Sequence, residues 1–319
     1  MSEYNRAVLG KQAAELGFIR DTFEKVSRLA GVLSFFERDP VLSQYLALKG
    51  GTAINLTIFG LPRLSVDIDF DFSENLAMED MKEIRESIRK TIRLHAAMNG
   101  YSFADKSRTY HTLDSDILQY INSAGARDNI KIEINYSLRS HLFQLSKRQI
   151  ETLGVFAPAK ITCLDSVEIF ASKIVALLTR AAARDLYDVN NMVSFGLFEN
   201  SQMESLRKSV VFYLAVGTEN IPETIGFGKM DALTFRDIRT RLTPMLKKKD
   251  SFDLGQARER VKDYLSELLV LSDNEKQFLS AFRNGRYLPE LLFCDETLER
   301  VRNHPMALWK MIVWNKQQL

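Results

Sequence analysis

The segment "SVDIDFDF" at residues 65–72 carries an aspartate at every second position, with apolar residues in between. Because side chains alternate between the two faces of a β-strand, this pattern predicts a strand with Asp67, Asp69 and Asp71 on one face. Aspartate is a poor strand former, and like charges that share a face repel one another. The acidic face of such a strand therefore needs partners that neutralise it.

A second strand with one apolar and one acidic face is predicted at residues 129–136, "NIKIEINY", where Glu133 lies opposite the isoleucines. Packed beside the first strand on a helix-backed sheet, it would bring Glu133 toward Asp67 and Asp69. Three converging carboxylates repel one another unless cations neutralise them, and two Mg²⁺ ions about 3.5–4 Å apart do so in many phosphoryl-transfer sites. The alternative is two antiparallel strands with one hydrated face.

A glycine turn precedes the acidic strand. In "LKGGTAINL" an apolar strand ends at Gly50-Gly51, and a helix is predicted to open at Thr52. Backbone N–H groups and the positive end of the helix dipole at such a turn can hold phosphate. Taken alone, a Gly-Gly pair also suits an ordinary tight turn.

The overall pattern predicts two domains. With 319 residues, of which 45% are hydrophobic and 26% charged, the chain is globular and long enough for two cores. An α+β domain is expected over residues 1–160 and a mostly helical domain over 161–319. The elements expected before this boundary are helical segments at 4–38 and 77–100, a hairpin at 116–122 and 129–137, and a short strand at 155–162.

Charge and cysteine content exclude several classes of protein. A net charge of +2 means that any nucleic acid must be held by a local patch, such as the basic runs 236–242 and 246–251 in the predicted helical half. Cys163 and Cys294 match neither a disulfide framework nor a zinc site, and both are expected to be buried. No apolar segment is long enough to span a bilayer, so a cytoplasmic protein without a membrane partner is expected.

Basic residues recur in the helical segment that is predicted to begin at Ser166. At 100° per residue, a continuous helix would bring Lys173 and Arg184 within about 20° of one another and place Arg180 beside them. This basic stripe could face phosphates. The alternative is a solvated charged helix surface.

The order of these motifs resembles the AbiEii/AbiGii family of bacterial toxins. The resemblance is carried by "KGGTAINL" and "RLSVDIDF" and covers residues 45–195. It implies a polymerase β-like nucleotidyltransferase fold, in which the turn at Gly50 and Gly51 holds a triphosphate. In that fold Asp67 and Asp69 bind metal, and Glu133 is the third acid.

The segment "RDLYD" is similar to a downstream motif of the same family. The similarity implies that Lys173 holds the β- or γ-phosphate, with Arg180 and Arg184 also at the nucleotide, and that Asp185 orients a nearby base or lysine. Asp188 is expected to pair with Arg184.

Two departures from the family pattern concern the triphosphate. Thr52 stands where many relatives have serine, and Leu177 stands where some have a second lysine. Ser65, two residues before Asp67, could bind phosphate or be modified, or it could simply start the strand.

By this resemblance the chain is expected to be a magnesium-dependent nucleotidyltransferase toxin. It would transfer nucleotides from an NTP to RNA, with the tRNA 3′ end as acceptor, and arrest growth in a toxin–antitoxin or phage-defence system with a cognate antitoxin. One alternative is transfer to a protein or small-molecule hydroxyl. Another is a non-catalytic nucleotide sensor or partner-binding module, against which the presence of all three acids argues.

Overall fold

The computed structural model describes residues 4–151 and 159–317, which fall into two compact units. The first unit comprises Met1–Arg139, Leu145–Leu164 and Pro244–Asp250, and the second comprises Ser140–Gln144, Asp165–Thr243 and Ser251–Leu319. Each unit thus includes a short segment from the other half of the sequence.

The first unit is built on a mixed sheet in the order β3-β5-β6-β2-β1-β8-β7, with β4 paired to β5. The predicted hairpin is confirmed, because β5 and β6 pair antiparallel across a tight turn. The strand predicted at 155–162 lies partly outside the described residues, and β8 covers its end. The strands are β1 (Leu46–Lys49), β2 (Asp67–Phe72), β3 (Ser102–Phe103), β4 (Arg108–Thr109), β5 (Leu113–Ile121), β6 (Arg127–Asn135), β7 (Ser146–Gln149) and β8 (Lys160–Cys163).

The helices of the first unit largely follow the sequence pattern. The predicted helical segment 4–38 is two helices, because Gly17 adopts a left-handed φ of 81° between them. Gly100, with φ 73°, follows the end of α5 as predicted. These helices are α1 (Arg6–Leu16), α2 (Arg20–Arg38), α3 (Pro40–Tyr45), α4 (Gly50–Ala53), the π-helical turn η1 (Ile54–Ile58) and α5 (Met78–Met98).

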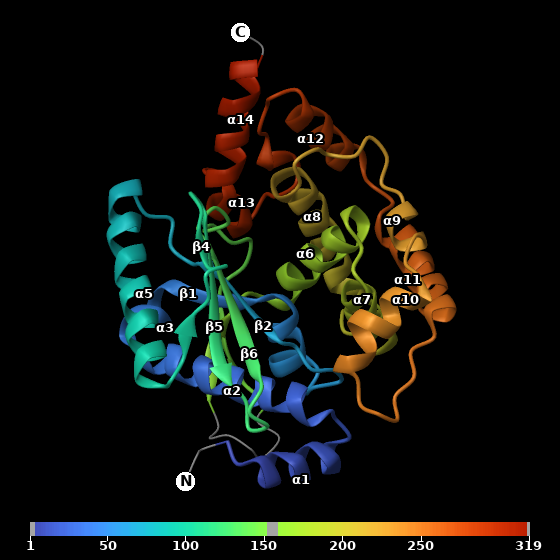
Figure 1. Cartoon of the computed structure of the whole chain (residues 1–319). Helices are drawn as coiled ribbons and strands as arrows, with labels where there is room; N and C mark the ends of the chain where they lie inside the picture. The colour runs from blue at the N-terminus through green and yellow to red at the C-terminus, as the bar shows by residue number, and fades with distance from the viewer. Residues whose placement is uncertain (1–3, 152–158, 318–319) are drawn as a thin grey trace. The chain divides into compact units, whose positions relative to one another are not determined.

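Helices cover the apolar face of this sheet, and Figure 1 shows α5 beside the strands. From α2, Phe36 stacks on Phe70 of β2 with ring centroids 5.0 Å apart. From α5, Arg85 makes an ion pair of 2.7 Å with Asp114 of β5. The apolar side chains of β2 and β6 are buried under this layer, so the acidic face of β2 turns the other way.

The lysine run at 247–249 belongs to the first unit, contrary to the expectation that it lies in the helical half. The Leu64 N–H donates to the Met245 carbonyl at 2.8 Å, and the Lys248 N–H donates to the Gly17 carbonyl at 2.7 Å. Leu246 is buried between these two contacts. Backbone hydrogen bonds and one buried side chain thus tie this segment to the unit that carries β2.

The second unit is helical and centres on α6, whose apolar side chains pack against α8. Asp165, one residue before the predicted start, caps α6 by accepting from the Val167 N–H. The helices are α6 (Ser166–Thr179), α7 (Ala183–Ser194), α8 (Asn200–Gly217), α9 (Gly228–Asp231), α10 (Phe235–Asp237), η2 (Ile238–Leu242), α11 (Leu254–Leu268), α12 (Asp273–Arg283), η4 (Pro289–Leu291), α13 (Glu296–Val301) and α14 (Pro305–Gln317).

Two further predictions from the sequence concern the cysteines and the presence of membrane-spanning helices. Both cysteines are free thiols, but only Cys163 is buried; Cys294 is exposed, so that prediction was wrong for it. Within the residues that the structure describes, no helix has the length and apolar character needed to cross a membrane.

A buried glutamate holds the segment Ser140–Gln144 in the second unit. Glu168 of α6 is fully buried and accepts from the hydroxyl of Tyr213, from the backbone N–H of Phe143 at 3.4 Å and from that of Leu142 at 3.3 Å. The His141 ring lies 3.2 Å away. Burial alone would raise the pKa of Glu168, but the charge of His141 and these hydrogen bonds outweigh it and lower the pKa.

We expect Glu168→Gln to lower the free energy of unfolding by about 2 kcal/mol at pH 7, because charge-assisted hydrogen bonds are lost. A lowered carboxyl pKa stabilises the fold above the unfolded value of about 4.3, and this contribution disappears as pH falls through the folded pKa. The difference in stability between the wild type and the variant should therefore shrink in urea titrations as pH falls below about 4.3. The exposed Glu259→Gln is the control, and an equal loss there would contradict the assignment.

Candidate functional site

The two acidic strands are neighbours in the sheet. Strand β2 pairs parallel with β6, and the register sets Asp69 beside Glu133 and Asp67 beside Lys131. Residues in register point to the same face of a sheet, so the acids share one face and the isoleucines share the other. The separation of faces that the sequence predicts is confirmed.

The side chain of Glu133 has partners on its own strand and on β5. Its Oε1 lies 2.8 Å from Lys131 Nζ and 3.3 Å from the Ser115 hydroxyl, which donates to it. In the described part of the chain, no group of three or more His, Cys, Asp or Glu side chains is arranged so that it could hold a metal ion. The backbone thus brings the predicted ligands Asp69 and Glu133 side by side, and the metal site itself stays a prediction.

The third aspartate of the motif has a structural partner. Asp71 is buried, and its Oδ1 lies 2.5 Å from Nζ of Lys49, the last residue of β1. A buried carboxylate needs a charge partner or hydrogen bonds. Lys49 supplies both and so holds β1 on β2 directly before the glycine turn.

Glycine is required at the turn itself. Gly50 has a φ of 70°, and a Cβ atom there would lie 2.5 Å from Oδ2 of Asp69. The backbone of the turn therefore passes directly against one of the predicted metal ligands. The helix starts at Gly50, two residues before the predicted start, and its first α-helical turn passes into η1.

The hydroxyls of Thr52 and Ser65 tie the turn to the acidic strand. Both residues are buried, and the two oxygens lie 3.0 Å apart. Thr52 also donates to the main-chain carbonyl of Asp67. The structure places both predicted nucleotide-binding hydroxyls beside Asp67, in contacts that position the turn.

Arg63, which the sequence did not single out, lies against the glycine turn. Its side chain is only 1% exposed, its Nη1 donates to the Leu64 carbonyl at 2.9 Å, and its Nη2 lies 2.9 Å from where a Cβ of Gly51 would stand. The guanidinium thus fills the space under the turn. The sequence does hint at this role, because Arg63 stands between a proline and a leucine just before an acidic strand. Arginine is seldom buried without a role.

In the second unit, Lys173 lies between two buried carboxylates. Its Nζ is 2.9 Å from Oδ1 of Asp185 and 3.3 Å from Oδ2 of Asp188. Burial alone would raise the pKa of Asp185, but Lys173, Arg180 and the Ala182 N–H together lower it. The structure therefore brings together Lys173 and Asp185, as the sequence predicted.

The predicted continuous helix with a basic stripe was wrong. Helix α6 ends at Thr179 and α7 begins at Ala183, with Ala181 between them at a left-handed φ of 47°. The side chain of Arg180 is 72% exposed, and Arg184 opens the separate helix α7. Lys173, Arg180 and Arg184 consequently do not share one helix face.

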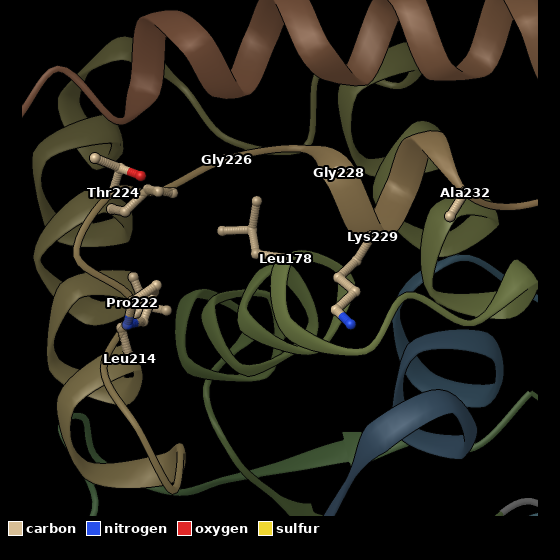
Figure 2. A pocket seen from close by; sticks show the side chains of 9 residues that line it. Leu178, Leu214, Pro222, Thr224, Gly226, Gly228, Lys229 and Ala232 are labelled. Carbon is tan, nitrogen blue, oxygen red and sulfur yellow. The ribbon is translucent and has the colours of Figure 1, made fainter.

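A hollow of about 440 Å³ lies elsewhere in the second unit (Figure 2). Leu178 projects into it beneath the segment Gly226–Gly228, and Leu214 and Pro222 line one side. None of its nine lining residues carries a carboxylate, and none is a predicted site residue. This hollow is therefore distinct from the acidic strands and from Lys173.

The glycine turn set against two acidic strands of a mixed sheet is the arrangement expected of a nucleotidyltransferase. The family model "Nucleotidyl transferase AbiEii toxin, Type IV TA system" matches residues 34–274, well over half of the chain. The chain belongs to this family, and it is a nucleotidyltransferase toxin of a type IV toxin–antitoxin system. Membership implies an NTP as substrate and an antitoxin as partner.

The fold agrees with a solved structure. MenT4, the nucleotidyltransferase toxin Rv2826c from Mycobacterium tuberculosis H37Rv, superposes with a TM-score of 0.63 at 16% sequence identity, over 97% of this chain and 99% of that one. At this identity the likeness concerns the fold. No curated protein sequence matches the chain.

We expect Gly50→Ala to destabilise the protein by about 3 kcal/mol, because it adds left-handed strain and an overlap with Asp69. Gly100→Ala is the matched control, since its φ is 73° and nothing lies within 4 Å of the new Cβ. It should cost about 1 kcal/mol. If both variants lose the same stability in urea titrations, the overlap with Asp69 adds nothing, and glycine is needed at position 50 only for its left-handed φ.

We expect Lys173→Met to cost about 3 kcal/mol of folding stability, because it leaves Asp185 and Asp188 without their shared cation. Arg180→Met removes an equal charge from an exposed side chain 3.7 Å from Asp185 and should change stability by less than about 0.5 kcal/mol. Chemical denaturation of both variants measures the difference. A stable Lys173→Met protein would argue against this assignment.

Proposed function

We propose that this toxin is a metal-dependent enzyme that transfers nucleotides from an NTP to a hydroxyl of RNA, with the tRNA 3′ end as acceptor. The observation that carries the proposal is the register of β2 and β6, which sets Asp69 beside Glu133 next to Gly50. Growth arrest follows if modified tRNA can no longer be charged.

Asp67, Asp69 and Glu133 are the residues that would hold divalent metal. They fit because carboxylate oxygens are the ligands Mg²⁺ prefers, and because all three lie on one face of neighbouring strands. Bound Mg²⁺ would activate the acceptor hydroxyl and neutralise the charge of the leaving pyrophosphate. Glu133 would have to turn from Lys131 to take part.

The chain's own groups would position the nucleotide. The backbone at Gly50 and Gly51 would approach the triphosphate. This backbone is held in place because Thr52 contacts Ser65 and donates to the carbonyl of Asp67 in β2. In the second unit, Lys173 would contact the β- or γ-phosphate. The contact between Lys173 and Asp185 supports the proposed role of Asp185 in orienting that lysine.

The first unit also offers cations for a nucleic-acid acceptor. Lys248 and Lys249 are exposed, and their segment is hydrogen-bonded to Leu64, three residues before Asp67. Lysines of this kind bind phosphate backbones without reading sequence. This favours RNA over the two other acceptors, a protein or a small molecule.

The test is label transfer. Purified toxin is incubated with each α-labelled NTP and total RNA, with protein and small-molecule acceptors in parallel. We expect label in tRNA, and a loss of about 100-fold or more in Asp69→Asn, because a charge-stabilising group at the reacting centre is removed. Growth inhibition by Asp69→Asn should fall together with its transfer activity.

Asp116→Asn is the matched control for this test. Asp116 lies in register with Ile132, on the opposite face of the same sheet. Burial, with the charge of Asp114, raises the pKa of Asp116 to about 6, so its neutralisation costs little. The Asp116→Asn variant should keep the nucleotide-transfer activity of the wild type. Full activity of Asp69→Asn at equal expression would refute the mechanism, and nucleotide binding without turnover on any acceptor would favour the non-catalytic alternative.

A further inference from the structure

On the acidic face, strands β1 and β6 each carry a lysine, Lys49 and Lys131, and the surroundings of these two lysines differ. Lys49 pairs with Asp71 at 2.5 Å, and the side chains are 23% and 3% exposed. Lys131 pairs with Glu133 at 2.8 Å, and these side chains are 38% and 30% exposed. The first pair is thus largely withdrawn from water, and the second is accessible to it.

The register sets Lys131 beside one predicted metal ligand, Asp67, and the ammonium of Lys131 contacts another, Glu133. Lys131 is in register with Asp67, and its partner Glu133 is in register with Asp69. Lys131 thus lies on the same strand and the same face as Glu133, one position before it on that face. Its positive charge therefore lies at Glu133, on the face that carries the predicted metal ligands.

We propose that Lys131 is a built-in counter-cation of Glu133, which competes with divalent metal for this carboxylate and so sets the metal affinity of the site. The inference rests on the proposed function, because it requires Glu133 to be a metal ligand. Lys131 is a positioning residue, since it acts through Glu133.

Burial decides which of the two lysines can be displaced. An ion pair open to solvent contributes little to stability, so Glu133 can exchange Lys131 for another cation at low cost. The long flexible side chain lets Lys131 swing into water once Glu133 is released. The buried pair of Lys49 and Asp71 cannot exchange in this way, because separation would leave a charge in an apolar environment.

The competition can be measured with Mn²⁺ alone, from the electron paramagnetic resonance signal of the free ion in titrations of the full-length protein. We expect Lys131→Met to bind Mn²⁺ about 3- to 10-fold more tightly, because a competing charge is gone. Lys131→Arg keeps the charge and should stay within about twofold of the wild type. Weaker or unchanged binding in Lys131→Met would overturn the proposal.

Lys147→Met is the matched control for net charge. Lys147 lies on β7, its pair with Glu37 is 2.5 Å long, and three strands separate β7 from β6 in the sheet. This variant should bind Mn²⁺ as the wild type does. If it also tightens binding, general electrostatics accounts for the effect and the specific role of Lys131 is refuted.

A second readout is the melting temperature with EDTA and with Mn²⁺. Lys131→Met removes the cation that competes with metal for Glu133, so its melting temperature should rise more on addition of Mn²⁺ than that of the wild type. An equal gain in both proteins would count against the proposal.

Glu133→Gln separates this inference from the proposed function. If Glu133→Gln leaves Mn²⁺ affinity unchanged, Glu133 is no ligand, and the proposed metal site fails together with the inference. If Glu133→Gln weakens binding while Lys131→Met does not strengthen it, the metal site stands and only the role of Lys131 is lost.

Discussion

The parallel pairing of β2 with β6 is the interaction on which the site depends. A slip of one residue would turn the acidic faces toward the helices and the apolar faces outward. Ile68, Phe70, Ile132 and Ile134 are buried on the helix side, and each contributes about 1.5–3 kcal/mol when fully buried. Repulsion between hydrated carboxylates costs about 1 kcal/mol. Hydrophobic burial therefore sets the register, and the register sets Asp69 beside Glu133.

The way in which each of these acids is neutralised depends on how deeply its side chain is buried. Asp71 is buried and is held by Lys49, whereas Glu133 is half-buried and is held by an accessible lysine. In the second unit, Lys173 lies between two buried carboxylates and is fixed by them. A deep pair serves the fold, because its separation is costly, and a shallow pair leaves its carboxylate available for other cations.

Local sequence pattern predicted much of the fold correctly. The alternation in "SVDIDFDF", the hairpin and the helix that ends before Gly100 depend on periodicity and on glycine conformation, and all are present. The continuous helix through Arg180 was wrong, because the chain turns at Ala181 in a conformation that its alanines did not signal. Capping energy and tertiary packing outweighed helix propensity there.

In the candidate site too, local sequence pattern predicted some residues and tertiary packing decided the others. Gly50, Asp69 and Glu133 could be named from the sequence, since motif and alternation are local, whereas Arg63 and the lysine run could not be placed. Arg63 became part of the site because the chain folds its guanidinium under Gly51. The lysine run joined the first unit through hydrogen bonds to residues more than 180 positions away in sequence.

The sequence by itself determined which side chains share a face of each strand, because the period of a strand is a property of the backbone. Only the tertiary structure decided which strands are neighbours, which acid each lysine neutralises and which of these pairs is open to water. Those outcomes depend on contacts between distant segments and on burial, and neither is encoded in any short stretch of residues.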